Sequence, residues 1–415
     1  MLSSTPTRLR PVHGIFGVAL ASLLTVAAVG AADSPTFRGP DRDGHFAAAG
    51  LLQEWPKEGP KMLWSTEGLG DSYASMAVAD GRIYTTGLVG ERGFAFALDL
   101  SGKILWKTEY GPAHSGSGYP GSRTTPTVAD GRVFLLSSMG EAVALDAKNG
   151  KIQWSMNLLE KFGGENIYFG MSESPLVDGG RVIFTAGGKD AALVALDAKS
   201  GDVVWTTKGL SDGAAYCNPR IMEHGDHRQI VTLVKEHLVG LDPATGAVLW
   251  KTPNKVQYDI HAVSPLFDGD LIYVSHGYDQ GGKAYRLAAD GRSVKEVWTE
   301  ADLDVHHGGP VLVDGRIYGA ASNKTWHMLD VETGKTLGTL KRLGKGTLIY
   351  ADGRIYGYLE NSKVVLVNPD PKNFGVVSEF EIKKGEGHHW SHPVISNGVL
   401  YVRHGDVLMA FDVKA

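Results

Sequence analysis

The sequence predicts an all-β fold, an eight-bladed β-propeller of four-stranded antiparallel blades. One motif, Ala-Leu-Asp-x-x-x-Gly-Lys-x-x-Trp or a close variant, recurs along the chain. The tryptophans of successive repeats are spaced 45–51 residues apart: Trp106, Trp154, Trp205, Trp250 and Trp298. A second motif, Asp-Gly-Arg followed by Ile or Val and an aromatic residue, precedes several copies, as at 130–134. Repeats of this length, made of short β runs and turns, are typical of propellers or solenoids.

Each repeat divides into four short strands. The Asp-Gly pair favours a two-residue hairpin turn because both central positions have positive φ, so it joins a first strand such as 125–129 to a second at 132–137. The third strand carries Ala-Leu-Asp, and the fourth ends at the Trp, whose ring can bury roughly 150–250 Å² between blades. A proline occupies the same place in most first strands. Because proline donates no ladder hydrogen bond, the first strand should be an edge strand that lines the channel.

The two ends of the chain carry complementary parts of one blade. Full repeats begin near Tyr73, Thr124, Ser172, Tyr216, His261, His307 and Lys345. An eighth begins near His389 but stops at 412–413, one strand short, whereas Lys61–Trp64 ends in the Trp of a fourth strand that nothing precedes. Pairing of 61–67 with 407–413 would complete the blade and remove an exposed sheet edge. We therefore assign residues 61–415 to the propeller and 33–60 to a leader segment.

The N-terminus predicts export. Arg8 and Arg10 precede an apolar stretch from Ile15 to Val29 and the small residues 30–32. This order is typical of a secretory signal peptide over residues 1–32, and the apolar stretch is short for a membrane span. An uncleaved anchor is the alternative. No cysteine lies near residue 32, so we expect a periplasmic or extracellular protein that is not lipid-anchored.

Composition limits the classes of function. The single cysteine, Cys217, excludes an intramolecular disulfide, and a chain of 415 residues can bury a sufficient core without one. A formal net charge of −5 argues against a nucleic-acid-binding face, which would be basic. After residue 32 no segment is apolar enough to cross a bilayer. We expect a monomer.

The repeat motif resembles the docking motif of pyrroloquinoline quinone (PQQ) repeat propellers. That family includes eight-bladed quinoprotein alcohol dehydrogenases and the lipoprotein of the outer-membrane barrel-assembly machinery. The segment Phe37–Gly44, with sequence FRGPDRDG, resembles the leader of PQQ-binding-like propeller proteins. The resemblance runs from Phe37 to the C-terminus and implies the fold. Members share the motif whether or not they bind the quinone, so it says little about function.

The candidate site lies where the links between blades enter the channel. All first strands run in the same direction, so the residues before each proline share one mouth, and function on propellers usually belongs to such convergent loops. His261, His306 and His389 occupy one register in blades five, six and eight. Imidazole is a common ligand for divalent transition metals, so this register predicts a metal site, with Glu173 as an oxygen ligand. Alternatively, these histidines hydrogen-bond the backbone at a polar rim.

Two cations at the same mouth offer a rival to the metal. Lys345 enters from blade seven, between His306 and His389, and would oppose a metal ion close by. An anionic ligand held by Lys345, Arg123 and protonated histidines is therefore the strongest alternative.

The family resemblance also implies a test for PQQ. Quinoprotein alcohol dehydrogenases hold the quinone with a vicinal cysteine pair, a tryptophan floor and a calcium ion on carboxylate and amide ligands. One cysteine rules out the pair. Glu173 and Asn218 are the candidates for calcium ligands and Trp390 for the floor, and we expect PQQ with calcium to bind weakly.

Two classes of function remain open. The first is a binding or scaffold module whose histidine-rich mouth takes a small-molecule ligand or another exported protein. The alternative is a PQQ- or metal-dependent oxidoreductase similar to the alcohol dehydrogenases.

Overall fold

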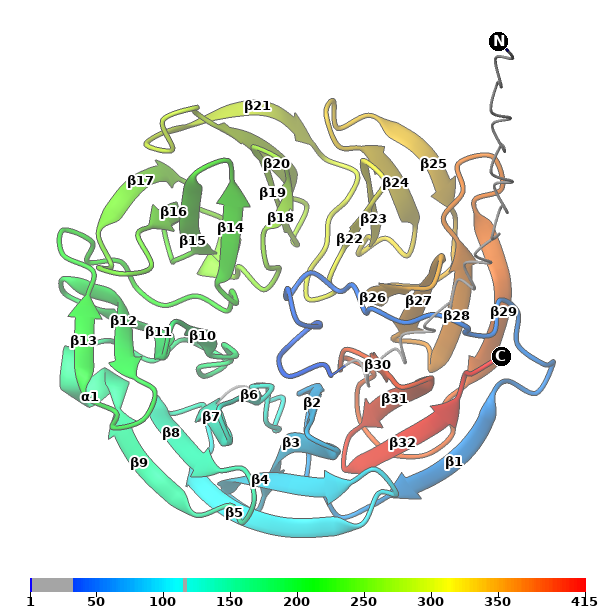
Figure 1. Cartoon of the computed structure of the whole chain (residues 1–415), viewed down its shortest axis with the longest axis horizontal. Coiled ribbons are helices and arrows are strands. Elements are labelled where there is room, and N and C mark those ends of the chain that lie inside the picture. The colour runs from blue at the N-terminus through cyan, green and yellow to red at the C-terminus, as the bar shows by residue number, and fades with distance from the viewer. Residues whose placement is uncertain (2–32, 115–117) are drawn as a thin grey trace. The chain divides into compact units, whose positions relative to one another are not determined.

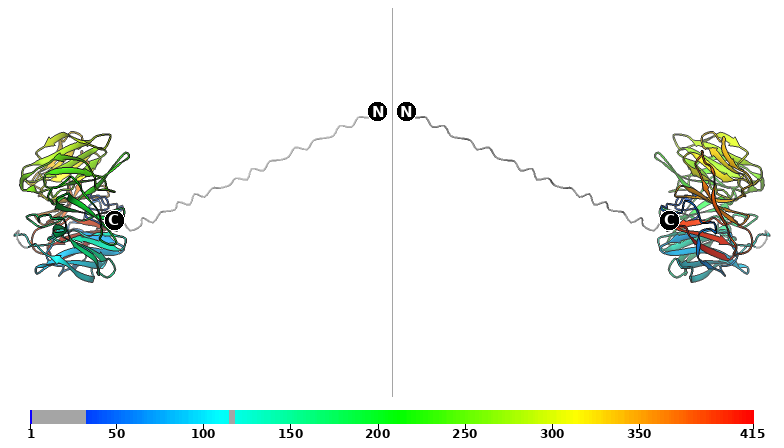
Figure 2. Two further views of the ribbon diagram at one scale, coloured as in Figure 1. Left: turned by 90° about the vertical axis from the view of Figure 1, so that its left-hand side faces the viewer. Right: turned by 90° about the vertical axis from the view of Figure 1, so that its right-hand side faces the viewer.

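The computed structural model describes residue 1, residues 33–114 and residues 118–415. Its strands form eight four-stranded antiparallel sheets arranged as blades in a ring, which confirms the predicted propeller (Figure 1). Figure 2 shows the same ring edge-on. The predicted signal peptide lies, except for Met1, outside the described residues. Within the described ranges, no helix has the length and apolarity needed to span a membrane.

The blades follow one another along the chain. Blade one comprises β2 (Met76–Ala79), β3 (Arg82–Val89), β4 (Arg92–Asp99) and β5 (Ile104–Pro112), and blade two comprises β6 (Thr127–Ala129), β7 (Arg132–Leu136), β8 (Glu141–Asp146) and β9 (Ile152–Asn157). Blade three comprises β10 (Leu176–Asp178), β11 (Arg181–Gly188), β12 (Ala191–Asp197) and β13 (Val203–Thr206), and blade four comprises β14 (Arg220–His224), β15 (His227–Leu233), β16 (His237–Leu241) and β17 (Val248–Pro253). Blade five comprises β18 (Leu266–Asp268), β19 (Leu271–His276), β20 (Gly281–Leu287) and β21 (Val294–Glu300), and blade six comprises β22 (Val311–Val313), β23 (Arg316–Ala320), β24 (Trp326–Asp330) and β25 (Thr336–Leu340). Blade seven comprises β26 (Gly346–Ala351), β27 (Arg354–Leu359), β28 (Lys363–Asn368) and β29 (Gly375–Glu381), and blade eight comprises β30 (Val394–Ser396), β31 (Val399–His404), β32 (Val407–Asp412) and β1 (Lys61–Thr66). The helix α1 (Leu158–Phe162) follows β9, and one turn of 3₁₀ helix, Gln257–Asp259, follows β17.

The hairpin turns form where the Asp-Gly pairs predict them. Asp130 has φ 48° and Gly131 has φ 70°, so both central positions are left-handed, as a two-residue hairpin requires. Asp146 forms the turn between the third and fourth strands of the same blade, because its Oδ1 accepts hydrogen bonds from Lys148 N (2.9 Å) and Asn149 N (3.0 Å).

The ring closes through its two terminal strands. β1 pairs antiparallel with β32, from Lys61 opposite Asp412 to Thr66 opposite Leu408. The pairing completes blade eight and leaves neither strand with an open inner edge, which confirms the predicted closure.

In five of the eight blades the repeated tryptophan docks onto the next blade. The indole Nε1 of Trp154 donates to Ala198 O (3.2 Å) in blade three, and that of Trp205 donates to Pro243 O (3.2 Å) in blade four. A glycine lies under each ring; at Gly201, with φ 79°, an added Cβ would come within 2.8 Å of Trp154 Cδ2. The motif therefore pairs a large ring in one blade with the one residue that leaves room for it in the next.

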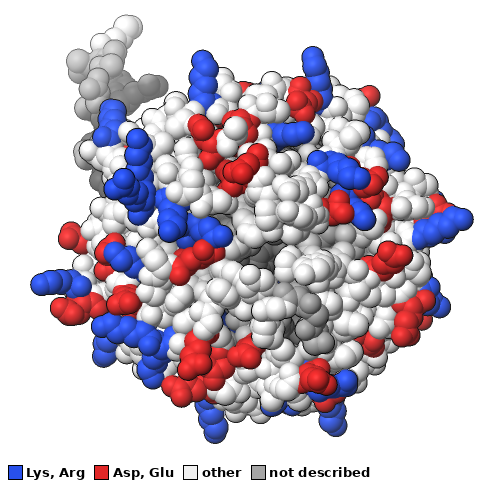
Figure 3. Space-filling model, turned by 180° about the vertical axis from the view of Figure 1, so that it is seen from behind, with Lys and Arg blue, Asp and Glu red and all other residues white. Residues whose placement is uncertain are grey.

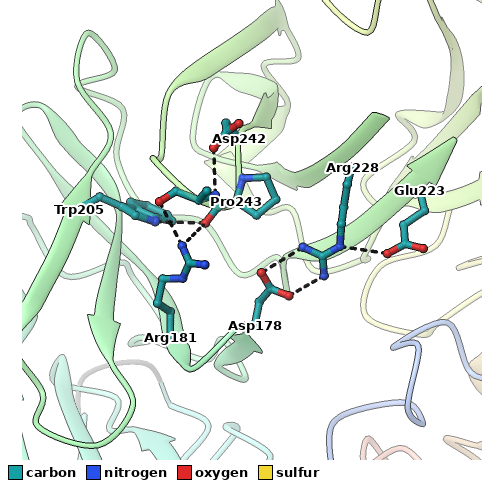
Figure 4. A network of polar contacts seen from close by, with 8 residues as sticks. Asp178, Arg181, Trp205, Glu223, Arg228, Asp242 and Pro243 are labelled. Atoms are coloured by element: carbon teal, nitrogen blue, oxygen red, sulfur yellow. Dashed lines mark hydrogen bonds and ion pairs between the residues drawn. The ribbon is translucent and has the colours of Figure 1, made fainter. Parts of the chain in front are cut away.

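Charged side chains add to the same blade-to-blade contact (Figure 4). Arg181 donates to the carbonyl oxygens of Pro243 (3.3 Å) and Ala244 (3.0 Å), beside the bond from Trp205 to Pro243. Arg228 in blade four pairs with Asp178 in blade three. These contacts fix the third and fourth blades relative to each other.

The leader runs into the centre of the ring (Figure 1, blue). Arg38, which is 3% exposed, donates to Leu348 O (3.0 Å) and Pro310 O (2.7 Å). Arg42 donates to Pro175 O (2.7 Å). The carbonyl groups at the start of several first strands thus find donors in the leader, a role that the sequence did not reveal.

Candidate functional site

One residue from every blade lines a common cavity at the channel mouth. These mouth residues stand three positions before the conserved place of the proline: Tyr73, Arg123, Ser172, Tyr216, Ala262, His307, Lys345 and Trp390. The cavity has a volume of about 370 Å³. Seen from the face opposite that of Figure 1, the centre of the ring is hollowed and bordered mainly by uncharged residues (Figure 3). The links between blades therefore converge as the repeat predicts.

The leader contributes to the inner wall of this cavity. Phe37 lines it, with its ring edge-on to His392 at 4.8 Å between centroids. Beneath, Arg38 donates to carbonyl groups of two blades. The channel is thus filled from the leader side, and the cavity opens at the mouth.

Two of the three predicted metal ligands point away from the cavity. His261 lies at the register before the mouth residues, is 0% exposed, and packs its ring against His276 at 5.1 Å. His389 forms a 2.6 Å hydrogen bond with Tyr358 and stacks on His404 at 3.8 Å. In an extended chain neighbouring side chains point to opposite sides, so a side chain one residue away from a cavity-lining residue points into the blade.

The third, His306, does line the cavity together with its neighbour His307. The chain bends at 306–308 instead of continuing as a strand, which lets both rings face inward. The three histidines therefore have separate surroundings, and in the described part of the chain no group of three or more His, Cys, Asp or Glu side chains could hold a metal ion. The geometry gives no support to one ion shared by His261, His306 and His389.

Burial keeps these imidazoles neutral. It lowers the pKa of His306 to about 4, helped by the neighbouring His307 and Lys345, and it lowers the pKa of His389 to about 4 as well. The pKa of His307 is also lowered, mainly by burial. At neutral pH the rings would act as uncharged hydrogen-bonding groups, so an anion site cannot rely on their protonation.

Arg123 is the cation that the cavity leaves without a carboxylate. Its guanidinium donates to Gly121 O (3.1 Å) and Tyr119 O (2.8 Å), and its central carbon lies 5.3 Å from the ring centre of Tyr73. Among the described residues it forms no ion pair. The backbone and the ring hold the group in place, and its charge remains available to a ligand.

Lys345, by contrast, is already paired, through a residue that the sequence did not single out. Glu360 Oε1 lies 3.2 Å from Lys345 Nζ and 3.1 Å from His307 Nε2, and it accepts a hydrogen bond from Trp390 Nε1 at 2.7 Å. Burial alone would raise the pKa of Glu360, but the hydrogen bond from His307 and the charge of Lys345 lower it to about 2. This carboxylate fixes three mouth residues and offsets the charge of one.

Aromatic rings form much of the remaining wall. Trp390 is stacked on His388 with centroids 4.1 Å apart and planes 6° apart, and it lies 4.9 Å from Tyr73. Loops outside the predicted register add Tyr119, Phe169 and Tyr278. Tyr278 and Glu360 both occupy turns between the second and third strands of a blade. Because strands alternate in direction, those turns share the mouth face with the links, and this rule could have found them from the sequence.

Glu173 and Asn218 each use one side-chain oxygen to accept a backbone hydrogen bond; Asn218 also lines the mouth cavity, and the second carboxylate oxygen of Glu173, Oε2, is buried without a partner among the described residues. Glu173, 1% exposed, accepts from Thr185 N at 2.9 Å, and Asn218 Oδ1 accepts from Ser174 N at 2.6 Å. Burial raises the pKa of Glu173 to about 7, so the carboxylate is readily protonated. Calcium prefers several charged oxygen ligands, and the only cysteine is buried. The residues present do not fit PQQ held with calcium.

The raised pKa of Glu173 predicts a pH-dependent stability. Because the folded-state pKa of about 7 lies above the ordinary value of 4.5, the native state binds this proton more tightly than the unfolded chain. The stabilisation is complete below pH 4.5 and is lost as the pH rises through 7. We expect the unfolding free energy to fall by roughly 3 kcal/mol more in the parent than in Glu173→Gln between pH 5 and 8, measured by urea denaturation.

Glu54→Gln is the matched control for this measurement. The side chain of Glu54 is exposed, and its replacement leaves the surroundings of Glu173 unchanged. The slope of this variant between pH 5 and 8 should equal that of the parent. Equal slopes for the parent and Glu173→Gln would contradict the prediction.

Comparison with known proteins agrees with the fold. A family model described as outer membrane protein assembly factor BamB matches residues 91–339, more than half of the chain. The BamB of Yersinia pestis is 25% identical over 317 residues, which cover 72% of this chain and 75% of that protein. The quinoprotein ethanol dehydrogenase of Pseudomonas aeruginosa is 29% identical over 145 residues, 32% of this chain and only 23% of the enzyme's length.

A solved structure shows the same architecture. The quinohemoprotein alcohol dehydrogenase of Comamonas testosteroni superposes with a TM-score of 0.67 at 12% identity, covering 92% of this chain and 81% of the enzyme. At that identity the likeness concerns the fold alone. The chain belongs to the PQQ-like β-propeller family whose model is described as outer membrane protein assembly factor BamB.

Proposed function

We propose that the protein is an exported ligand-binding module whose mouth cavity takes a small, planar, negatively charged molecule. The observation that carries this proposal is the mouth itself: all eight blades contribute one residue to a single cavity of about 370 Å³. A concave site with aromatic walls and a few fixed polar groups is the usual form of a small-molecule site.

The walls indicate the shape and charge of the ligand. The ring centroid of Trp390 lies 4.9 Å from that of Tyr73 and 5.4 Å from that of Tyr119. Such a cluster of aromatic rings suits a flat ligand. Arg123 supplies a positive charge that no carboxylate of the described residues offsets, whereas Glu360 offsets Lys345. An anionic group would therefore bind beside Arg123. His306 and His307 would serve as neutral partners.

The alternative of a protein partner is favoured by a second observation. The face around the mouth carries exposed aromatic side chains, with Tyr168 71% and Tyr258 66% exposed. Such residues are enriched in protein interfaces. The family match to an assembly factor is compatible with a scaffold role for this rim. The oxidoreductase alternative has less support, because the chain has a single cysteine and because burial raises the pKa of Glu173, the one carboxylate among the candidate calcium ligands, to about 7.

Two dyes that differ by one sulfonate test the ligand site. 1-Anilinonaphthalene-8-sulfonate is an aromatic anion with a flat naphthalene ring, and N-phenyl-1-naphthylamine is the same ring system without the charge. We expect both to bind the parent with enhanced fluorescence. Arg123→Gln should weaken the sulfonate at least about tenfold and leave the uncharged dye within about twofold, because only the former uses the guanidinium.

Trp390→Ala should weaken both dyes, since both stack on the ring. Arg132→Gln, which removes an arginine of the same blade outside the cavity, is the matched control and should change neither. Equal affinities for the two dyes in the parent and in Arg123→Gln would argue against an anion site. Failure of Trp390→Ala to affect either dye would place binding elsewhere and overturn the proposal.

A further inference from the structure

A second hollow, the side groove, opens beside the mouth cavity. It has a volume of about 670 Å³ and shares Tyr216 with the cavity. Its walls come from blades three to five and include Tyr168, Asp212, Lys235, His237, Tyr258 and Asp259. None of these residues lines the mouth cavity, although Tyr168 and Tyr258 also belong to the aromatic rim described above for a protein partner.

An oriented imidazole lies in this groove. Asp212 Oδ2 lies 2.7 Å from His237 Nδ1, and the carboxylate is 6% exposed while the imidazole is 24% exposed. The carboxylate therefore holds the proton on Nδ1. In the described part of the chain Nε2 has no protein partner, so it is left to exchange a hydrogen bond with a ligand.

The neighbouring backbone holds this pair rigidly. Asp212 Oδ1 accepts from Glu236 N at 3.2 Å, and Lys235 N donates to Gly213 O at 3.0 Å. Behind the groove, the Nε2 atom of His261, which the sequence predicted as a metal ligand, lies 3.2 Å from Lys235 O. Groups fixed before binding lose little freedom when a ligand arrives.

A strained turn places an aromatic ring at the same groove. Tyr258 and Asp259 have φ values of 62° and 56°, a left-handed conformation that is unfavourable for a non-glycine residue. Asp259 Oδ2 pairs with Lys235 Nζ at 3.4 Å, which helps to hold the turn. The Tyr258 ring, 66% exposed, lines the same groove as His237 and packs edge-on against Tyr278 at 5.1 Å between centroids, and Tyr168 offers a second exposed ring. Strain that persists in this way is typical of ligand-holding segments.

The charges of the groove favour hydrogen-bond donors that carry no negative charge. Its carboxylates, Glu165, Asp212, Glu236 and Asp259, outnumber its ammonium groups, Lys235 and Lys251. Lys235 is paired with Asp259. Hydroxyl groups can donate to these carboxylates and exchange hydrogen bonds with His237 Nε2, whereas an anion would be repelled.

We propose that the side groove binds a short uncharged saccharide. A sugar ring combines an apolar face of C–H groups, which matches an exposed tyrosine ring, with an edge of hydroxyl groups, which matches the imidazole and carboxylates. His237 and Tyr258 would be the residues that contact it, and Asp212 would act as a positioning residue. This site is separate from the mouth cavity, and neither proposal depends on the other.

Binding of maltotriose, cellotriose and chitotriose to the purified protein tests the proposal by calorimetry and by saturation-transfer NMR. We expect at least one trisaccharide to bind, and His237→Phe to weaken it at least about tenfold, the loss of one hydrogen bond to a fixed partner. Tyr258→Phe keeps the ring and should bind like the parent.

Tyr258→Asn separates binding from folding. Asparagine tolerates positive φ better than tyrosine, so this variant should unfold at the same or a higher temperature and yet bind at least about tenfold more weakly. His224→Phe, in the same blade outside the groove, should bind like the parent. So should Arg123→Gln, which separates this result from that of the mouth cavity.

Three outcomes would overturn the proposal. The first is no binding of any of the three trisaccharides to the parent. The second is binding that His237→Phe and Tyr258→Asn leave unchanged. The third is tight binding of the polyamine spermidine that excludes the trisaccharide, because the carboxylates would then mark a site for cations.

Discussion

Deletion of residues 61–66 is expected to turn a soluble protein into an aggregating one. These residues are β1, whose ladder with β32 closes the ring. Without it, the hydrogen-bonding edge of β32 is open, and the strand is almost wholly apolar from Val407 to Phe411. An open, apolar edge is a template for pairing with another chain. Size-exclusion chromatography with light scattering should show large species where the parent gives one discrete peak.

A substitution within β1 provides the matched control. Met62 and Leu63 are 40% and 44% exposed, so replacing both with threonine removes side chains and keeps the backbone ladder. Threonine favours the strand conformation, and this variant should elute like the parent. A deletion variant that is as soluble and as stable as the parent would refute the importance of closure.

Replacement of Trp154 with alanine is expected to lower the unfolding free energy by about 3–5 kcal/mol. The ring is 9% exposed and lies between blades two and three, in a cluster with Phe134 and Val182. Its removal leaves a void that the rigid turn at Gly201 cannot fill, and it leaves Ala198 O without the indole donor. Urea denaturation followed by circular dichroism would measure the loss.

Two variants resolve the contributions to that loss. Trp154→Phe keeps most of the ring but not the N–H group, and should cost less than the alanine variant. Ile152→Ala changes a residue of the same strand that is 51% exposed, and should alter stability by no more than about 0.5 kcal/mol. A Trp154→Ala variant as stable as Ile152→Ala would contradict the docking role.

The sequence predicted the blades well because short-range chemistry fixes them. Asp-Gly pairs set the first hairpin, as the φ values of Asp130 and Gly131 show, and the Trp marks the strand that meets the next blade. Closure followed from two incomplete repeats. None of these inferences requires knowledge of contacts between distant side chains.

The site was predicted less completely, because the predicted histidine register is displaced by one residue from the positions that line the cavity. The sequence located the inward links but not which side of each link faces the cavity, and His261 and His389 lie one position away from the lining residues. The predicted residues that do line it are Arg123, Asn218, His306, Lys345 and Trp390. The roles of Phe37 and Glu360 depend on contacts with chain segments far away in the sequence, Glu360 with Trp390 at a separation of 30 residues and Phe37 with His392 at the other end. No local pattern encodes such pairings.

Ring closure also determines when the last blade can form during synthesis. Thr66 at the end of β1 pairs with Leu408, more than 340 residues later. At about 5–20 residues per second, a ribosome needs roughly 20–70 s to make the chain between them. During that interval β1 has no partner strand, and the carbonyl groups of Pro310 and Leu348 that receive Arg38 do not yet exist when the leader emerges. The nascent chain can therefore complete its last blade only after β32 has been made, close to the C-terminal end of the sequence.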